Sequence, residues 1–338
     1  MLSAVISMEP HLDDLPRSNE DLLSVGAAHA SDLQALCNDV TAMIFPSAMA
    51  PPTEETISAV TRKLVALVTD IEARLLGHDP QVSTANPQTW PLLAQSGFLR
   101  QADLIDYMLA RVAEDRLEEK LATSTRHLPA QLLNHPDPNV AEAAQTLLAA
   151  DSLYRRARGY SYQALRPELL HQLCWRLVAA IEVDNGKRDI AVIASVRALL
   201  SEYDEGRTAQ AAALKLSHFL GNERRSDLLD PNIAGLHLFV AHIANALEID
   251  QDHVLHLIDI GSCAPFVIML RAVGIDAERA MAIIYLFKTF ALTPRDIGLF
   301  DRGFAKLEQD IAKAEVRRWA YARGQFLMFP HSGKPGAC

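Results

Sequence analysis

Apolar residues recur at helical spacing along most of the chain. In the N-terminal part, two apolar stripes advance in steps of three and four residues, which is the period of helices that pack side by side. Their central positions are Leu33, Leu36, Val40, Val60, Leu64 and Leu67. We expect residues 18–77 to form a long helical hairpin whose stripes meet a second copy in a dimer seam, or pack within the same chain.

Helix start signals continue beyond this hairpin. Asp137 followed by Pro138 is a good N-cap and first-turn pair. The same spacing of apolar residues predicts further helices at residues 101–111, 114–134, 166–183, 189–202, 207–220, 232–248, 251–258, 263–273 and 276–289. No segment alternates with period two for long enough to predict a strand. The pattern therefore indicates an all-α fold.

A linker-like stretch separates the hairpin from the later helices. Residues 77–89 are rich in Gly, Pro, Asn and Ser, which places a module boundary near residue 87. Beyond it, successive helix pairs start about 35 to 45 residues apart, as in degenerate HEAT repeats. We expect a HEAT-like α-solenoid over residues 87–325, with flexible ends at 1–17 and 326–338.

The stretch from Pro231 to Leu247 contains no Asp, Glu, Lys or Arg. It is shorter than the roughly 20 apolar residues that a membrane-spanning helix needs. A helix that is apolar on most sides in a soluble protein lies in the centre of the fold. We therefore predict a buried helix here and no membrane partner.

Composition and charge narrow the function. The 338 residues are 49% hydrophobic and 22% charged, which is typical of a globular protein, and a net charge of −10 argues against a nucleic-acid partner. The four cysteines are far apart with no CxxC pair, so we expect a reduced, cytoplasmic chain. Nucleotide-binding and hydrolase signatures (GxGxxG, GxxxxGK[ST], GxSxG) are absent from the sequence. We therefore predict no cofactor and no catalytic residue, and consider an enzyme the less favoured class.

Two segments resemble a known bacterial family. Residues 90–112 (WPLLAQSGFLRQADLIDYMLARV) carry a proline, two leucines, a serine and an acidic helix start in the order of a repeat opening, and residues 259–276 end an apolar helix in Leu-Arg-Ala-x-Gly. The first set is Pro91, Leu93, Ser96, Leu99 and Asp103. These patterns are similar to the domain of unknown function 2336 family over residues 87–290. The resemblance implies a HEAT-like helical fold and transfers no reaction and no site residue.

One basic and aromatic run is the leading candidate for an interaction surface. It comprises Arg155, Arg156, Arg158, Tyr160 and Tyr162. Arg and Tyr are enriched at protein interfaces. The alternative is a helix C-terminus, where cations complement the helix dipole, followed by an exposed loop.

Histidine residues suggest two alternative functions. His29 lies on the first helix of the expected hairpin, and histidine phosphotransfer proteins carry their phosphoacceptor on such an element, although the apolar seam would shield it. His253 and His256 are three residues apart on a predicted helix, as two metal ligands can be. A third ligand at metal-site spacing is missing, so a structural role is the simpler interpretation of this pair.

The sequence therefore predicts a non-catalytic, all-α interaction or scaffold protein in the cytoplasm. Its partner is an unknown protein, and a homodimer is a second expectation. Signalling phosphotransfer through His29 and a metal-dependent function through His253 and His256 stay open as alternatives.

Overall fold

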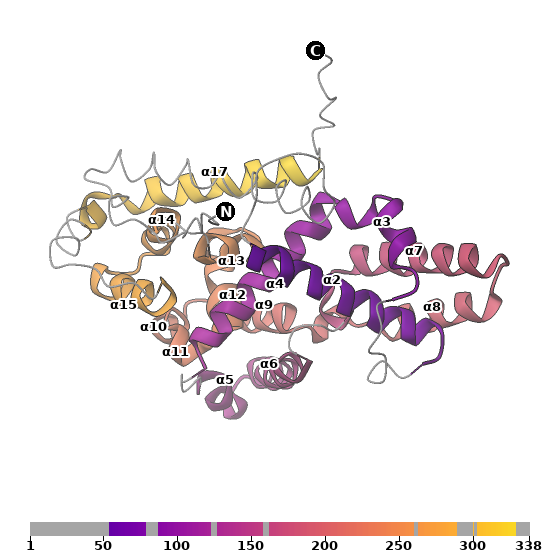
Figure 1. Cartoon of the computed structure of the whole chain (residues 1–338). Helices are drawn as coiled ribbons and strands as arrows, with labels where there is room; N and C mark the ends of the chain where they lie inside the picture. The colour runs from indigo at the N-terminus through magenta and orange to yellow at the C-terminus, as the bar shows by residue number, and fades with distance from the viewer. Residues whose placement is uncertain are drawn as a thin grey trace, which may run out of the picture. The chain divides into compact units, whose positions relative to one another are not determined.

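The computed structural model describes residues 54–78, 87–122, 127–157, 162–259, 263–288, 300 and 303–328. All regular structure in these ranges is helical, without a strand (Figure 1). The prediction of an all-α fold is confirmed for this part of the chain. None of the helices described is both long enough and apolar enough to cross a membrane.

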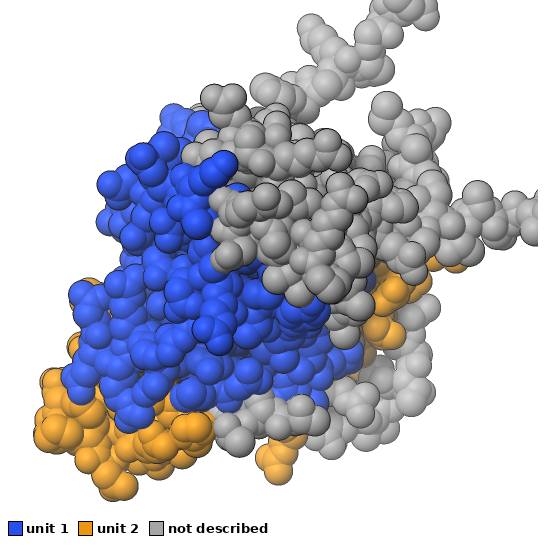
Figure 2. All heavy atoms as spheres, turned by 90° about the vertical axis from the view of Figure 1, so that its left-hand side faces the viewer, with its two compact units in different colours: residues 1–36, 116–126, 222–338 blue, residues 37–115, 127–221 orange. Residues whose placement is uncertain are grey.

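The chain divides into two compact units, which are coloured in Figure 2. Unit 2 draws its described residues from 37–115 and 127–221, and unit 1 draws its described residues from 116–126 and 222–338. Helix α4 contributes to both units, because the division falls between Asp115 and Arg116. Described helices on both sides of residue 87 belong to unit 2.

Unit 2 contains helices of very different lengths. Its elements are α2 (Glu54–Leu75), α3 (Trp90–Gln95), η2 (Phe98–Arg100), most of α4 (Ala102–Lys120), α5 (Leu128–Gln131), η3 (Leu132–Asn134), α6 (Pro138–Ala157), η4 (Tyr162–Ala164), α7 (Pro167–Asn185), α8 (Ile190–Glu202), η5 (Glu205–Arg207) and α9 (Ala209–Leu220). The start of α6 confirms the predicted cap, because the Asp137 carboxylate accepts a hydrogen bond from the Asn139 backbone N–H at 2.9 Å.

A buried carboxylate ties α2 to the start of α3. Glu72 of α2 accepts hydrogen bonds from the backbone N–H groups of Gln88 and Thr89 at 2.9 and 3.0 Å, and from the Thr89 hydroxyl. Anions are stabilised at a helix N-terminus, where backbone N–H groups lack helical partners. The residues expected to end a linker are thus held against the preceding helix.

Small residues let α6 and α9 pack closely. Ala143 and Ala144 of α6 and Ala212 and Ala213 of α9 are all fully buried, and the two helices contact each other along much of their lengths. Helix–helix distance depends on the side chains at the contact. Alanine on both sides therefore favours a short separation between the two helices.

Unit 1 surrounds one buried helix. It contains the last turn of α4 together with α10 (Arg225–Leu228), α11 (Pro231–Ala234), α12 (Leu236–Leu247), α13 (Gln251–Asp259), α14 (Ala264–Ala272), α15 (Ala277–Lys288) and α17 (Gln309–Met328). Every residue of α12 from Leu236 to Ala244 is buried, as its charge-free sequence predicts. Gly235 at φ 80° separates α11 from α12, so the predicted single helix over 232–248 is wrong in its first turn.

A glycine ends α14 in unit 1. Gly274 has φ 78°, and the Ile275 backbone N–H donates to the Leu270 carbonyl oxygen at 3.1 Å, as in a glycine-terminated helix. A Cβ atom at this position would lie 2.9 Å from the Gln309 side-chain nitrogen. The final glycine of the Leu-Arg-Ala-x-Gly pattern is thus favoured by its backbone conformation, and a larger residue would also displace the Gln309 side chain.

Other helix boundaries differ from the predictions. Helix α4 runs without a break through residues 112–113, where a boundary was expected, and ends at Lys120. Helix α17 continues to Met328, past the expected start of a flexible tail at 326. The predicted N-terminal segment 1–17, the first helix of the hairpin, its turn at 45–52 and the residues after 328 lie outside the described residues.

Candidate functional site

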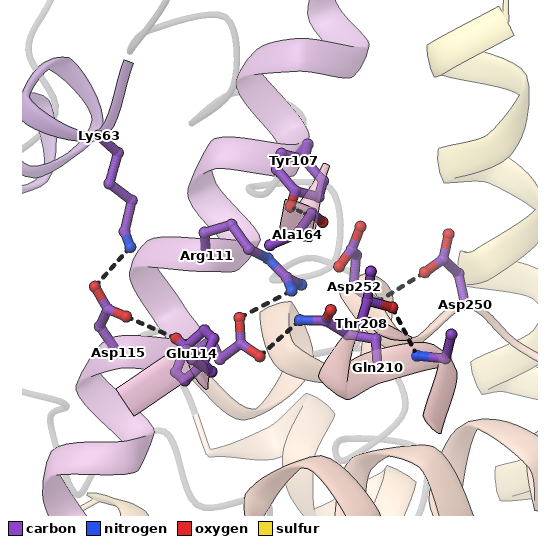
Figure 3. A network of polar contacts seen from close by, with 12 residues as sticks. Lys63, Tyr107, Arg111, Glu114, Asp115, Ala164, Thr208, Gln210, Asp250 and Asp252 are labelled. Atoms are coloured by element: carbon purple, nitrogen blue, oxygen red, sulfur yellow. Dashed lines mark hydrogen bonds and ion pairs between the residues drawn. The ribbon is translucent and has the colours of Figure 1, made fainter. Parts of the chain in front are cut away.

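One turn of α4 carries a cluster of buried and half-buried polar groups in unit 2 (Figure 3). This α4 cluster consists of Lys63, Arg111, Glu114, Asp115, Tyr154 and Gln210. The first comes from α2, the next three from α4, and the last two from α6 and α9. Four helices of the unit are thus joined through polar side chains around a single helical turn.

The deepest contact of the α4 cluster is an ion pair within α4. The Arg111 guanidinium lies 2.8 Å from Glu114 Oε2, and their side chains are only 3% and 1% exposed. The second carboxylate oxygen, Oε1, accepts a hydrogen bond from Gln210 Nε2 at 2.8 Å. Buried charges are tolerated when they are paired and hydrogen-bonded in this way.

Asp115 joins α2 to α6 at the edge of the cluster. Its carboxylate lies 2.6 Å from the Lys63 ammonium and accepts a hydrogen bond from the Tyr154 hydroxyl at 2.7 Å. Burial lowers the pKa of Lys63, and Asp115 opposes this shift. Burial, together with the charges of Glu114 and Asp115, raises the pKa of Tyr154 well above its usual value. Both pKa shifts arise because the charged form of the side chain is poorly solvated in the protein interior.

Tyr107 extends the polar contacts along α4. Two guanidinium groups lie within cation–π distance of its ring, with Arg111 at 5.0 Å and Arg166 at 5.6 Å from the ring centre. Its hydroxyl donates to the Ala164 carbonyl oxygen at 2.5 Å. These contacts hold η4 and the start of α7 against α4.

The α4 cluster combines an amine, a phenol and two carboxylates, which are groups that can transfer protons. The Lys63 amine, the Tyr154 ring and the Arg111–Glu114 pair are buried. A general acid or base must come within hydrogen-bond distance of a substrate atom. The arrangement therefore supports the positioning of four helices.

The expected basic and aromatic surface is divided by the structure. Arg155 and Arg156 are exposed in the last turn of α6, where cations complement the helix dipole. Arg158 and Tyr160 lie outside the described residues. Tyr162 is only 5% exposed, and the Arg74 guanidinium stacks over its ring at 4.8 Å. Tyr162 therefore is a packing residue of unit 2 and cannot contribute to an exposed surface.

The expected dimer seam is also changed by the structure. Its α2 half, Val60, Leu64 and Leu67, is buried within the chain, so these side chains are not available to a second copy. This burial agrees with the alternative of packing within the chain. The other half, Leu33, Leu36 and Val40, and the candidate phosphoacceptor His29 lie outside the described residues.

His253 and His256 are buried on α13 in unit 1. Asp259 on the same helix forms an ion pair with Arg116 at 3.2 Å. Across the described ranges, no three His, Cys, Asp or Glu side chains are grouped so that they could hold a metal ion. The pair therefore lacks a third protein ligand within the part of the chain that the structure describes.

Among the described residues of unit 2, the most exposed large apolar side chains lie at the end of the α7–α8 helical hairpin. We define the hairpin tip as residues 183–190. Val183 in the last turn of α7 is 67% exposed, and Ile190 at the first position of α8 is 78% exposed. Trp175, two turns before Val183 on α7, is also partly exposed. Exposed apolar side chains gain free energy when another surface covers them.

The hairpin tip is held by hydrogen bonds. Gly186, at φ 64°, ends α7 in the left-handed conformation. The Asp189 side chain accepts hydrogen bonds from the Ala191 and Val192 backbone N–H groups at 3.0 and 3.3 Å, which caps α8. The Asp189 backbone N–H donates to Glu182 Oε1 at 3.3 Å. Val183 and Ile190 are thus presented on a capped turn between two helices.

Sequence reasoning missed both the α4 cluster and the hairpin tip. Lys63 and Asp115 are 52 positions apart in the chain, so no local pattern connects them. The tip had a readable signal, because Val183 and Ile190 are β-branched residues that flank a turn marked by Gly186 and Asp189. Apolar residues on both sides of such a turn have little of the hydrophobic core within reach, so they are expected to stay exposed.

Comparisons of the chain with protein-family models, with curated proteins and with solved structures found no match in any of the three. The resemblance to the domain of unknown function 2336 family thus stays a prediction that rests on the motifs at 90–112 and 259–276. The candidate site is therefore described by geometry alone. It consists of the α4 cluster, which positions helices of unit 2, and the exposed hairpin tip between α7 and α8.

Proposed function

We propose that this chain is a non-catalytic interaction protein that docks another protein chain on the tip of its α7–α8 hairpin. The observation that carries the proposal is the exposure of Val183 and Ile190 on a capped turn. Two β-branched side chains exposed to water gain free energy when a partner covers them, at about 25 cal/mol per Å² of apolar area.

The tip combines apolar and charged side chains. Lys187 and Arg188 are exposed between the two apolar residues, and Trp175 lies further along α7. Aromatic residues and arginine are enriched at protein interfaces. The α4 cluster supports this role indirectly, because it fixes the helices of unit 2 from which the hairpin extends.

A capture experiment with paired variants tests the proposal. The tagged full chain is incubated in native lysate of the source cells, beside Ile190→Asp and the matched control Leu153→Asp. Leu153 is an exposed apolar residue on α6, 53% accessible, so the same change is made away from the tip. We expect wild type and Leu153→Asp to retain one protein near stoichiometry, and Ile190→Asp to lose at least nine-tenths of it.

Two results would refute the proposal. One is wild-type chain that retains no protein near stoichiometry. The other is capture that Ile190→Asp and Leu153→Asp reduce equally. Far-UV circular dichroism of each variant establishes that the helical fold is retained before capture is compared.

The HEAT-like arrangement is part of the same proposal. Its support is that helices adjacent in sequence pack as pairs in each unit, including α7 with α8, α12 with α13 and α14 with α15. Paired helices that stack repeatedly give extended surfaces suited to protein binding. Small-angle X-ray scattering tests it: a stack predicts an elongated particle, and a radius of gyration near the compact value for 338 residues, about 20 Å, would contradict it.

A further inference from the structure

The hairpin tip contains the only Asn-Gly pair in the sequence, Asn185 followed by Gly186. Asparagine loses its side-chain amide most readily before glycine, because glycine has no side chain to obstruct attack by its backbone nitrogen on the amide carbon. Every other asparagine in the described ranges is followed by a larger residue. This chemistry is therefore least obstructed at the tip.

The surroundings of the pair are open. Residues 183–188 are all exposed, and the Asn185 side chain forms no hydrogen bond within the described part of the chain. Apart from the two neighbouring residues, no atom lies within 4 Å of the position that a Cβ of Gly186 would occupy. The carboxamide is thus free to turn toward the Gly186 nitrogen.

One contact opposes the attack. The Gly186 backbone N–H donates to the Val183 carbonyl oxygen at 3.3 Å, and this bond must open before the nitrogen can react. It is longer than a typical N–H to O hydrogen bond and lies at a helix end, where the last turn frays. Local opening of an exposed turn leaves the buried part of unit 2 intact.

We infer that Asn185 and Gly186 form a self-modification site through which the hairpin tip changes with time. The Gly186 backbone nitrogen gives up its proton and attacks Asn185 Cγ. A bond forms between these two atoms, the Cγ–Nδ2 bond breaks, and Nδ2 leaves as ammonia with the released proton. The product is a five-membered imide ring, and no group is oxidised or reduced.

Water then opens the ring in one of two ways. Addition at Cγ restores the original main chain and leaves aspartate at position 185. Addition at the main-chain carbonyl carbon of residue 185 leaves isoaspartate, in which the chain runs through the side chain and is longer by one methylene group. Water is the only co-reactant in either route.

Both products change the surface that the proposed function uses, so the effect on docking rests on that proposal. Residues 182–189 hold three carboxylates and two cations, so a new carboxylate changes their net charge from −1 to −2. It also lies at the end of α7, where the helix dipole disfavours negative charge. The longer chain of isoaspartate displaces Gly186 from its place at the helix end, so Val183 and Ile190 are no longer presented on the same capped turn.

Peptide mapping by mass spectrometry measures the conversion without reference to any partner. The full chain is kept for several weeks in mildly alkaline buffer, and the asparagine, aspartate and isoaspartate peptides are separated. We expect the peptide with Asn185 to gain about 1 Da in most molecules. Asn185→Gln is the matched variant, and it is expected to show no gain because its longer side chain would have to close a six-membered ring.

Two asparagines of the same chain are internal controls. Asn222 is exposed like Asn185 but is followed by Glu223. Asn139 is held by a hydrogen bond from its Nδ2 to Asp137 Oδ1 at 3.1 Å. Both are expected to keep their amides under conditions that convert Asn185.

Capture from lysate tests the consequence for docking. Each protein is compared with its own fresh sample, so any difference in initial capture between wild type and Asn185→Gln does not enter. We expect aged wild type to lose capture in proportion to the converted fraction, and aged Asn185→Gln to keep the capture of its fresh sample.

Each outcome decides a different claim. If Asn185 keeps its amide as Asn222 does, the inference is overturned whatever the partner does. Conversion without loss of capture overturns the effect on docking and supports the self-modification site alone. If neither fresh nor aged wild type captures a protein, the proposed function fails, while peptide mapping still decides the site.

Discussion

Glu114→Gln is expected to destabilise the chain strongly, because it leaves Arg111 charged in the interior without its carboxylate. Both side chains are almost completely buried, so solvent screening does not reduce the effect. Removing one partner of a buried ion pair costs about 3–5 kcal/mol. Gln210 loses a charged acceptor at the same time, which points to the upper half of that range.

Urea unfolding followed by far-UV circular dichroism measures this change in the free energy of unfolding. The control is Glu142→Gln, the same substitution at an exposed position of α6, which is expected to change stability by less than about 0.5 kcal/mol. Arg111→Met in the Glu114→Gln background removes the orphaned charge. We expect this double variant to recover about 2 kcal/mol relative to the sum of the two single effects. A loss below about 1 kcal/mol for Glu114→Gln, or strictly additive effects, would refute the account of the cluster.

Three further changes test other contacts. Ala212→Leu places a large side chain between α6 and α9, so we expect a loss of about 1–3 kcal/mol in urea unfolding; an unchanged midpoint would contradict close packing there. Gly274→Ala strains a residue at φ 78° and crowds Gln309, so we expect the free energy of unfolding to fall by about 1–3 kcal/mol. An unchanged free energy of unfolding would contradict this expectation. Burial, with the charge of Arg225, lowers the pKa of His242 to about 4. Because the unfolded chain then binds a proton between pH 6.5 and 4 that the folded chain does not, stability falls as pH falls through this window, by about 3 kcal/mol. In the His242→Gln variant, the loss of stability between pH 6.5 and 4 is expected to be smaller by this amount. If the stability of wild type and variant changes equally with pH, His242 does not titrate in this way.

The sequence predicted elements whose determinants are local. Asp137 and Pro138 are adjacent, so the start of α6 was readable from a cap and a first-turn proline. The charge-free run before Leu247 likewise predicted a buried helix. Its interruption at Gly235 was missed, because a glycine in a helical pattern is compatible both with a helix and with a break.

Contacts between distant residues were not predictable in the same way. The stripe of Val60 and Leu64 shows that a face is buried but carries no information on which surface covers it, so a dimer seam and an internal core gave the same pattern. In the sequence, Lys63 on α2 resembles an ordinary solvated lysine. It belongs to the core only because Asp115 lies beside it in the folded chain. Side-chain burial of this kind is decided by tertiary packing.

The hairpin tip shows how a local signal can be overlooked. Ile190 has the apolar character of a core residue, yet its place at the first position of α8 leaves it outside the packed layers. A helix N-terminus directs its first side chain away from the helices that cover the next turns. Exposure of this residue is the feature on which the functional account depends.

The most direct measurement is photo-crosslinking from the tip. A photoreactive amino acid replaces Ile190 in the full chain, and a second protein carries it at Leu153 as the control. The account predicts a discrete protein adduct from position 190 that is absent from position 153, with a mass of two chains if the partner is a second copy. No adduct from position 190, or equal adducts from both positions, would contradict the claim that the hairpin tip is the docking surface.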